Sequence, residues 1–218
     1  MKKLVVLLLG CLPVLTFAAG GGYNEHVEKA AVNLQDRVSL QNGAQIFVNN
    51  CMGCHGLEYQ RYGRTAQDLG IPVDLAQTYL NFTTNAVGDR MASAMSQESG
   101  AAWFGVAPPD LSNITHWRSA DWLYSYLINF YPDESRPFGH NNRVFENVAM
   151  PHVLADMEAD LGEAEFRAAM LDLTNFLHYV SEPVRLERER LGVKVLVFLF
   201  LLLIPAYLLK KEYWKDIH

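Results

Sequence analysis

The chain has 218 residues with a formal net charge of −6 at pH 7, and half of its residues are hydrophobic. No internal repeat occurs, which excludes a repeat architecture, and the negative charge argues against a nucleic-acid partner. The stretch from Gly20 to Arg190 has the size of one domain and carries 12 Lys and Arg against 22 Asp and Glu, a net charge of −10. This excess favours a basic partner, and it is explained equally well by solubility.

The N-terminus has the order of a secretory signal peptide. Lys2 and Lys3 precede an apolar run from position 4 to 15, and two small residues, Ala18 and Ala19, follow it. Residues 1–19 are therefore predicted to be a cleaved signal, which places the domain outside the bacterial cytoplasm. One alternative is a lipoprotein cleavage site before Cys11, although the apolar run that precedes this cysteine is short.

A short helix is predicted from Leu40 to Val48, with Ser39 as its N-cap. It leads into Cys51-Met52-Gly53-Cys54-His55. The pattern Cys-x-x-Cys-His is the attachment signal of a c-type haem. Two thiols at this spacing reach the two vinyl groups of one porphyrin, and the adjacent imidazole ligates the iron. One covalently attached haem c is therefore expected, and with it a role in electron transfer.

A Cys-x-x-Cys pair can also form a thiol redox site or contribute to a zinc site. A thiol redox site normally follows a buried strand, whereas a helix is predicted here. A zinc site needs two further ligands, and the third cysteine, Cys11, lies in the segment predicted to be removed. Both are much less favoured than haem.

Helical periodicity dominates the rest of the domain. The clearest amphipathic helix is predicted from Glu163 to Val180, with Asp160 and Glu163 as its capping pair, and a second from Ser119 to Phe130. A third is predicted from 74 to 82. No alternating run long enough for a substantial sheet occurs. The fold class expected is mainly α, a cytochrome c-like haem domain with long loops.

The sixth iron ligand has several candidates. Met150 is favoured because it lies in a loop directly before Pro151, and a proline biases the preceding residue toward an extended conformation. A thioether ligand would raise the reduction potential relative to histidine. His152 is its main rival. The remaining candidates are Met91 and Met95, expected in a helix or turn, then Met157, Met170, His116, His140 and His178.

The C-terminus carries a predicted transmembrane helix. Residues 191–209 are apolar except for Lys194, and 19 residues make about 28 Å of helix, close to the thickness of the hydrocarbon core. Lys210, Lys211 and Lys215 follow, so the tail of residues 210–218 is expected in the cytoplasm and the domain of residues 20–190 in the periplasm. Pro205 lies near the end of this span, where a kink is tolerable.

Several motifs together carry a resemblance to a known family. These are the segment from Cys51 to Arg64, the sequence PPDLS at 108–112, the segment from Asp121 to Ser125 followed by a Tyr-Pro loop, and Ala149-Met150-Pro151. Their order resembles that of cytochrome c1, the haem subunit of the cytochrome bc1 complex of a bacterial inner membrane, over nearly the whole chain. The resemblance implies that Cys51 and Cys54 hold the haem, that His55 and Met150 ligate iron, and that Arg118 pairs with a haem propionate.

The resemblance also implies partners and a function. The subunit would take one electron from a Rieske iron-sulfur protein and pass it to a cytochrome c, within a ubiquinol:cytochrome c oxidoreductase that also contains cytochrome b. It would not be an enzyme by itself. A second hypothesis keeps the haem and places it in a membrane-anchored cytochrome that serves a terminal oxidase or another periplasmic reductase. A third is a haem catalyst or sensor with an open sixth position.

Overall fold

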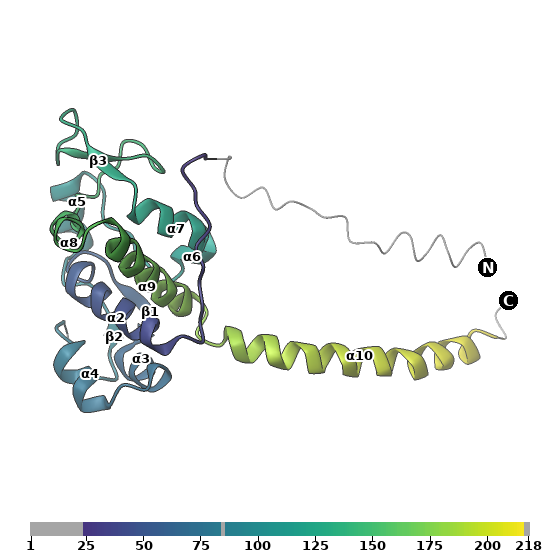
Figure 1. The fold of residues 1–218 in the computed structure, drawn as a ribbon. Coiled ribbons are helices and arrows are strands. Elements are labelled where there is room, and N and C mark those ends of the chain that lie inside the picture. The colour runs from purple at the N-terminus through teal and green to yellow at the C-terminus, as the bar shows by residue number, and fades with distance from the viewer. Residues whose placement is uncertain (1–23, 84–85, 216–218) are drawn as a thin grey trace.

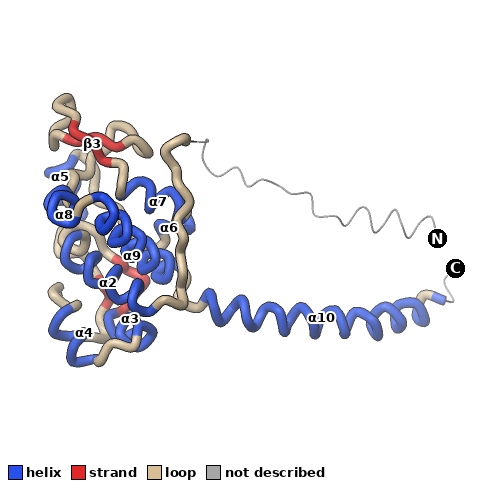
Figure 2. Tube along the Cα trace, viewed as in Figure 1, coloured by secondary structure: helices blue, strands red, loops and turns tan. Residues whose placement is uncertain are grey.

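The computed structural model describes residues 24–83 and 86–215 (Figure 1). The described residues are mainly helical and are joined by long loops with little sheet (Figure 2), which confirms the predicted fold class. The predicted signal, residues 1–19, lies outside them. The elements are α2 Arg37–Asn50, β1 Leu57–Arg61, α3 Tyr62–Leu69, α4 Val73–Tyr79, β2 Arg90–Met91, α5 Gln97–Phe104, α6 Ile114–Trp117, α7 Ala120–Leu127, β3 Phe130–Pro132, β4 His140–Asn142, α8 Ala155–Leu161, α9 Glu163–Ser181 and α10 Arg185–Tyr213.

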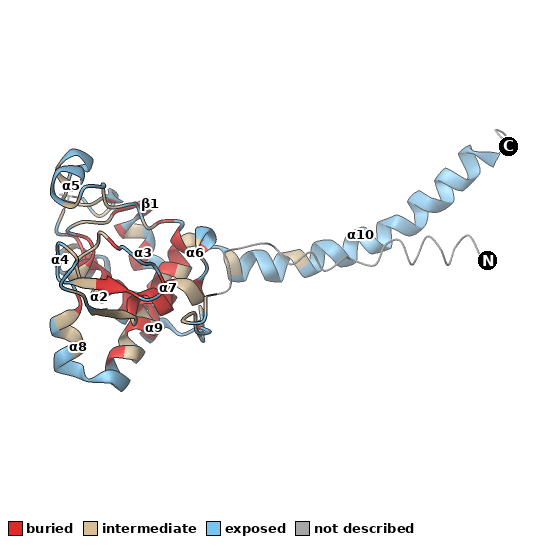
Figure 3. Ribbon diagram, turned by 90° about the horizontal axis from the view of Figure 1, so that it is seen from above, coloured by how far each residue is buried: buried red, intermediate tan, exposed pale blue. Residues whose placement is uncertain are grey.

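The core forms where α2 crosses α9. Gly43 lies at the crossing, and a Cβ built on it would stand 2.1 Å from the carbonyl oxygen of Asp172 on α9. Only a residue without a side chain lets the two backbones approach so closely. The rings of Phe47 and Phe176 then pack across the same crossing, with centroids 6.0 Å apart. Figure 3 shows that the buried residues gather in α2, α7 and α9.

Helix α9 confirms the predicted amphipathic helix, because the apolar residues that recur on one face at helical spacing are all buried, namely Phe166, Met170, Leu173, Phe176, Leu177 and Val180. The predicted capping pair is wrong. Asp160 lies inside the preceding helix α8, and Gly162 precedes α9 without a side-chain cap. Gly162 has φ 76°, a conformation that favours glycine, and it separates α9 from α8, a helix that was not predicted from the sequence.

Three other predicted elements change their bounds. Helix α2 begins at Arg37, because Asp36 is its N-cap and accepts a hydrogen bond from the backbone N–H of Ser39 at 3.1 Å. Helix α7 ends at Leu127 rather than Phe130. The side-chain amide of Asn129 donates to the carbonyl oxygen of Ser125 at 2.8 Å and so takes an acceptor that a further helical turn would use. The third predicted helix is Val73–Tyr79, and Met91 lies in strand β2 rather than in a helix or turn.

Two short antiparallel ribbons are formed by the described strands. Strands β1 and β2 pair Leu57 with Met91, directly after the Cys-x-x-Cys-His motif. Strands β3 and β4 pair Phe130 with Asn142 and lie beyond the end of α7 (Figures 1 and 2). The β3–β4 ribbon positions the loop of residues 143–149 that leads to Met150.

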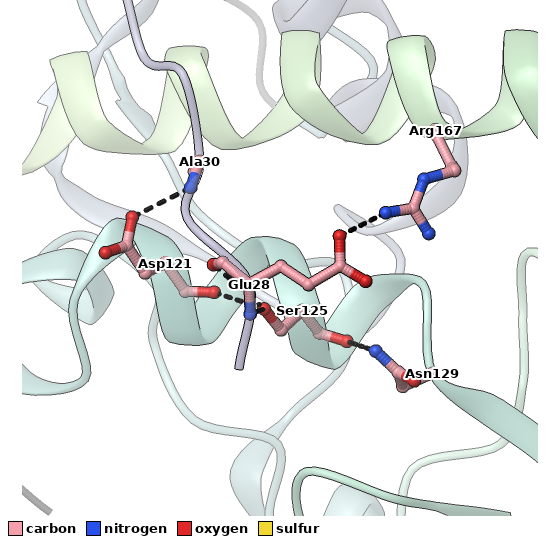
Figure 4. Close-up of polar contacts among 6 residues, drawn as sticks. All are labelled: Glu28, Ala30, Asp121, Ser125, Asn129 and Arg167. Atoms are coloured by element: carbon pink, nitrogen blue, oxygen red, sulfur yellow. Dashed lines mark hydrogen bonds and ion pairs between the residues drawn. The ribbon is translucent and has the colours of Figure 1, made fainter. Parts of the chain in front are cut away.

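Residues 24–36 form an extended segment, here called the N-terminal strap, which runs along the domain to the root of α10 (Figure 1). The backbone N–H of Glu28 donates to Ser125 Oγ at 2.7 Å, and that of Ala30 donates to Asp121 Oδ1 at 2.9 Å (Figure 4). The Glu28 carboxylate also forms an ion pair with Arg167 of α9. The strap therefore ties α7 to α9 by polar contacts.

Helix α10 projects away from the domain and has no buried residue, as Figure 3 shows by its exposed colour. It has 29 residues, and its most apolar window has a mean hydropathy of 2.4, which makes it the one helix among the described residues long and apolar enough to cross a membrane. The helix begins at Arg185, six residues before the predicted span, and continues through Pro205. A long helix with apolar side chains on all sides and none buried matches the expected single anchor.

Candidate functional site

The Cys-x-x-Cys-His motif forms one tight turn at the end of α2. Cys51 is the C-cap of that helix, and its carbonyl oxygen accepts hydrogen bonds from the backbone N–H groups of Cys54, at 3.0 Å, and His55, at 2.8 Å. Because the turn is closed by these bonds, the two thiols and the imidazole are held together on one short segment. Both cysteines are free thiols.

The chemistry of Cys51 does not suit a thiolate site. Burial, and secondarily Cys54, raise the pKa of its thiol to about 12, whereas redox thiols and zinc ligands have lowered values. No group of three His, Cys, Asp or Glu side chains suited to a metal ion occurs in residues 24–83 and 86–215. The two cysteines, one turn apart, remain suited to thioether formation with a porphyrin.

The ring of His55 is oriented by the PPDLS segment. Its Nδ1 lies 2.7 Å from the carbonyl oxygen of Pro109, and since a carbonyl only accepts, Nδ1 carries the proton and donates. Burial lowers the pKa of His55, so the neutral imidazole is favoured. Its Nε2 therefore keeps a free lone pair, which is the requirement for an iron ligand.

The PPDLS segment is itself fastened to the turn that follows the motif. The backbone N–H of Leu111 donates to the carbonyl oxygen of Gly56 at 2.9 Å, and Asp110 Oδ2 accepts from the backbone N–H of Glu58 at 2.8 Å. One backbone contact and one side-chain contact thus set the position of the Pro109 carbonyl relative to His55. This is the type of outer hydrogen bond that fixes the tautomer of a metal-ligating histidine.

Met150 is partly buried beside α7. Its sulfur lies 3.3 Å from the hydroxyl of Tyr126, which donates to it. Burial raises the pKa of Tyr126, so this hydroxyl remains a proton donor. The sulfur has a second lone pair and can also face a metal.

Most of the other methionine sulfurs are buried in the core or contact other groups. Met91 and Met170 are fully buried in the core, and Met52 accepts a hydrogen bond from the Tyr62 hydroxyl. Met95 lines a pocket of about 240 Å³ together with Cys54, Pro108 and Asp110.

The main histidine rivals also have partners. His152 is packed face to face on Phe130 with centroids 4.6 Å apart, and its Nε2 lies 2.8 Å from Glu158 Oε2. His178 lies between Thr115 and Arg185. His140 Nδ1 lies 3.3 Å from the carbonyl oxygen of Phe138. Each of these rings has one nitrogen or more with a partner, while His152 Nδ1 is buried and has no hydrogen-bond partner among the described residues.

Arg118 follows α6 and is surrounded by aromatic rings. Its guanidinium carbon lies 4.3 Å from the ring centroid of Trp117, 5.1 Å from that of Trp122 and 5.7 Å from that of Phe145. Across the described parts of the chain, Arg118 forms no ion pair with a carboxylate of the protein, although cation–π contacts stabilise it. A cation held in this way is available to an anionic group such as a propionate.

One continuous row of side chains connects Arg118 to Met150. Trp122 stacks on Tyr126 with centroids 5.1 Å apart, and Tyr126 then reaches Met150. Both Trp122 and Tyr126 belong to α7, one turn apart. The chain segment from Pro109 to Tyr126 therefore links the partner of His55, the Arg118 guanidinium and the partner of Met150.

Sequence reasoning missed three residues of this region: Pro109, Tyr126 and Arg136. The Pro109 carbonyl lies inside the PPDLS motif, but its role needs the three-dimensional approach of His55. Tyr126 lies in the amphipathic helix predicted from Ser119 to Phe130, and only the structure places its hydroxyl at a sulfur. Arg136 donates to the loop before Met150, and no motif in the sequence marks it.

Comparison with known proteins adds a family. A family model described as "Cytochrome C1 family" matches residues 27–217. The chain is 45% identical to the "Cytochrome c1" of Allochromatium vinosum and 40% identical to the "Ammonia monooxygenase gamma subunit" of Nitrosomonas europaea, each over the full length of both chains. It is 27% identical to the "Cytochrome b-c1 complex catalytic subunit, mitochondrial" of Candida albicans, over 84% of this chain and 73% of that one.

Proposed function

This chain belongs to the cytochrome c1 family, and from that premise we propose that it is the electron-transfer subunit of a ubiquinol:cytochrome c oxidoreductase. It takes one electron from a Rieske iron-sulfur protein and passes it to a cytochrome c. The relatives that carry the names cytochrome c1 and cytochrome b-c1 support a complex with cytochrome b. In this function the chain transfers electrons and does not act as a general acid or base.

The residues at the site have separate tasks in this proposal. Cys51 and Cys54 would hold the macrocycle as thioethers, and His55 Nε2 and the Met150 sulfur would ligate the iron. One haem c bound by these residues provides one-electron iron chemistry. The single observation that carries the proposal is the hydrogen bond of 2.7 Å from His55 Nδ1 to the Pro109 carbonyl, since it leaves Nε2 free as a ligand.

Arg118 is proposed to pair with a haem propionate. Its charge has no carboxylate partner within the described residues, and the rings of Trp117, Trp122 and Phe145 orient it. A cation near the iron disfavours the more positive oxidised state, so Arg118 should raise the reduction potential. Arg118→Gln is expected to lower the potential measured by redox titration.

The proposed topology is a single-pass subunit of the bacterial inner membrane. Residues 1–19 are the removed signal, residues 20–190 the periplasmic domain, residues 191–209 the span and residues 210–218 the cytoplasmic tail. The exposed apolar surface of α10 supports the span, and Lys210 and Lys211 near its end support the orientation. Labelling of a cysteine introduced at position 215 from each side of the membrane would test it.

The decisive experiment on the site is covalent retention of the chromophore. The full chain, produced in a host competent in haem ligation, should stay red after acidic organic extraction. Cys51→Ala combined with Cys54→Ala should lose the colour. A colourless wild-type protein with both thiols free to alkylate would reject the proposal.

The axial ligand is tested by a matched pair of variants. Met150→Ala should abolish the absorption that arises from sulfur-to-iron charge transfer and lower the potential. His152→Gln should leave that absorption in place. A wild type that lacks this absorption, and whose spectrum changes in His152→Gln but not in Met150→Ala, would assign the sixth position to the histidine. Rapid binding of carbon monoxide by the wild-type ferrous protein would indicate an open position instead.

The complex is tested by purification under mild detergent. Cytochrome b and a Rieske protein should be recovered with the tagged chain. Recovery with a terminal oxidase or a periplasmic reductase would favour a different membrane-anchored cytochrome. Recovery with a monooxygenase would connect the chain to the assembly that the name of the Nitrosomonas europaea relative indicates.

A further inference from the structure

The guanidinium of Arg136 forms three hydrogen bonds with the loop that leads to Met150. Arg136 lies between β3 and β4, and its NH2 group donates to the carbonyl oxygens of Asn147, at 2.9 Å, and Val148, at 3.1 Å. Its NH1 group donates to Asn147 Oδ1 at 3.1 Å. One side chain therefore holds two consecutive carbonyl groups and the side chain of Asn147. Asn147 is three residues before Met150.

Forming these contacts costs desolvation free energy, because part of the Arg136 guanidinium is removed from water. Such a cost indicates that the contacts have a specific role. Arg136 Nε is buried and has no hydrogen-bond partner, and within the described residues the guanidinium forms no ion pair. A buried polar group without a partner costs free energy that the three loop contacts must offset. The planar fork of arginine suits this arrangement, because its donors point in fixed directions toward adjacent acceptors.

The loop itself has little other support from regular structure. Residues 143–149 belong to neither helix nor strand, and Asn147 has φ 60°, in the left-handed region. Asn141 Oδ1 accepts from the backbone N–H of Asn147 at 2.9 Å, and Asn142 Oδ1 accepts from that of Val144 at 2.9 Å. Side chains of the β3–β4 ribbon thus satisfy the backbone groups of this loop that a ladder would otherwise satisfy.

The same ribbon is joined to α7, which carries the partner of the Met150 sulfur. Asn142 is fully buried, and its side-chain amide donates to the carbonyl oxygen of Tyr126 at 2.7 Å. The Tyr126 hydroxyl reaches the sulfur at 3.3 Å. The loop is therefore held from the ribbon at Asn147 and from α7 at Met150, and Arg136 supplies most of the hold at the first point.

We propose that Arg136 is a positioning residue that presents Met150 to the haem iron by clamping the 147–148 backbone. The inference rests on the proposed function, in which the Met150 sulfur is an axial ligand. Without the clamp the loop samples more conformations, so the sulfur leaves the iron more often. Arg136 contacts neither the sulfur nor the residues of the Cys-x-x-Cys-His turn, and it acts through the loop.

The test compares three variants of the full-length holoprotein. Arg136→Gln removes the clamp, and Arg136→Lys keeps the charge but replaces the planar fork by one ammonium group. Arg143→Gln is the matched control, because Arg143 lies in the same loop, is exposed and packs over the ring of Tyr131 at 5.0 Å. It removes an equal charge and the contact with Tyr131, but none of the contacts to the 147–148 backbone.

The first measurement is the rate at which carbon monoxide binds the ferrous protein, since binding requires the sulfur to leave. Arg136→Gln should raise this rate by at least about tenfold, which corresponds to the loss of one to two net hydrogen bonds. Arg136→Lys should show a smaller increase, and Arg143→Gln should match the wild type. Equal rates in Arg136→Gln and the wild type, or equal increases in Arg136→Gln and Arg143→Gln, would overturn the inference.

The second measurement is amide hydrogen exchange of residues 144–147, which does not depend on the iron ligand. Exchange should be faster in Arg136→Gln than in the Arg143→Gln control, and equal exchange in the two variants would contradict a clamp. Met150→Ala, measured in parallel, separates the two proposals. If it leaves the sulfur-to-iron absorption of the wild type unchanged, the ligand assignment fails. If it abolishes that absorption while Arg136→Gln leaves every readout unchanged, the clamp alone fails.

Discussion

The hydroxyl of Tyr126 donates a hydrogen bond to the sulfur of Met150, with 3.3 Å between oxygen and sulfur. A donor at one lone pair withdraws electron density from the sulfur and makes it a weaker donor to ferric iron. Tyr126→Phe is therefore expected to lower the reduction potential of the proposed haem. Because a net hydrogen bond contributes about 1 kcal/mol, the change should be on the order of tens of millivolts.

Tyr124→Phe is the control for this change. Tyr124 lies on the same helix and has the same exposed fraction as Tyr126, 9%, but its ring packs below the guanidinium of Arg167. It should keep the wild-type potential in a redox titration. A shift of the same size in both variants would attribute the effect to the helix rather than to the sulfur contact.

Gly43 should tolerate no larger residue. A Cβ at this position would lie 2.1 Å from the carbonyl oxygen of Asp172 and 2.7 Å from the Cβ of Phe176, so α2 and α9 would have to separate. We expect Gly43→Ala to cost about 1–3 kcal/mol or more in the free energy of unfolding, as overpacking does. Chemical denaturation followed by circular dichroism measures it, and Gly88→Ala, where nothing lies within 4 Å, should change little.

The N-terminal strap depends on Ser125. This fully buried hydroxyl accepts from the backbone N–H of Glu28 and donates to the carbonyl oxygen of Asp121, each at 2.7 Å. Ser125→Ala leaves the Glu28 N–H without its acceptor, and the expected cost is about 1–3 kcal/mol. Ser135→Ala, at an exposed turn, is the comparison. Limited proteolysis of the strap should be faster in the Ser125 variant, and identical cleavage would show that the strap is held by its other contacts.

His178 should make stability depend on pH. Its Nε2 lies 2.7 Å from an Arg185 nitrogen, which donates to it, and its Nδ1 lies 3.0 Å from Thr115 Oγ1. Burial, then the charges of Arg185 and His116, lower the pKa of His178, while Glu182 and Asp121 raise it more weakly. The neutral imidazole is therefore the form that the fold accepts.

The lowered pKa of His178 determines in which direction the free energy of unfolding changes with pH. Above about pH 6.5 the histidine is neutral in the folded and unfolded states, and its contacts contribute fully. As the pH falls below about 6.5, the unfolded chain takes up a proton that the folded protein resists, so stability is lost. The free energy of unfolding should fall less steeply with acidification in His178→Gln than in the wild type. Parallel pH profiles of the two proteins would contradict this reasoning.

Local chemistry in the sequence was sufficient for several features. The spacing of Cys51, Cys54 and His55 predicts their use, because a tight turn and a haem both require residues at adjacent positions. The apolar stripe of α9 was confirmed residue by residue, since a helix that packs on one face repeats every 3.6 residues. The apolar α10 was likewise evident, because hydropathy over some 20 residues depends on no contact elsewhere in the chain.

The ends of the helices could be predicted less well from the sequence. Asp36 rather than Ser39 begins α2, and Asn129 ends α7, because each terminus is decided by which side chain reaches a free backbone group. Gly162 separates α9 from α8, which has no buried residue and was not predicted. Such choices differ by a few tenths to about 1 kcal/mol, so tertiary packing decides between them.

The contacts between distant segments were decided by the tertiary structure alone. Pro109 meets His55 across 54 positions of sequence, Tyr126 meets Met150 across 24, and Arg136 meets the loop before Met150 across 11 and 12. Sequence determined which residues carry the reactive atoms, because that is a property of each side chain and its neighbours. Only the folded chain determined how those atoms are aimed, because a hydrogen bond depends on distance and direction between groups that the sequence leaves far apart.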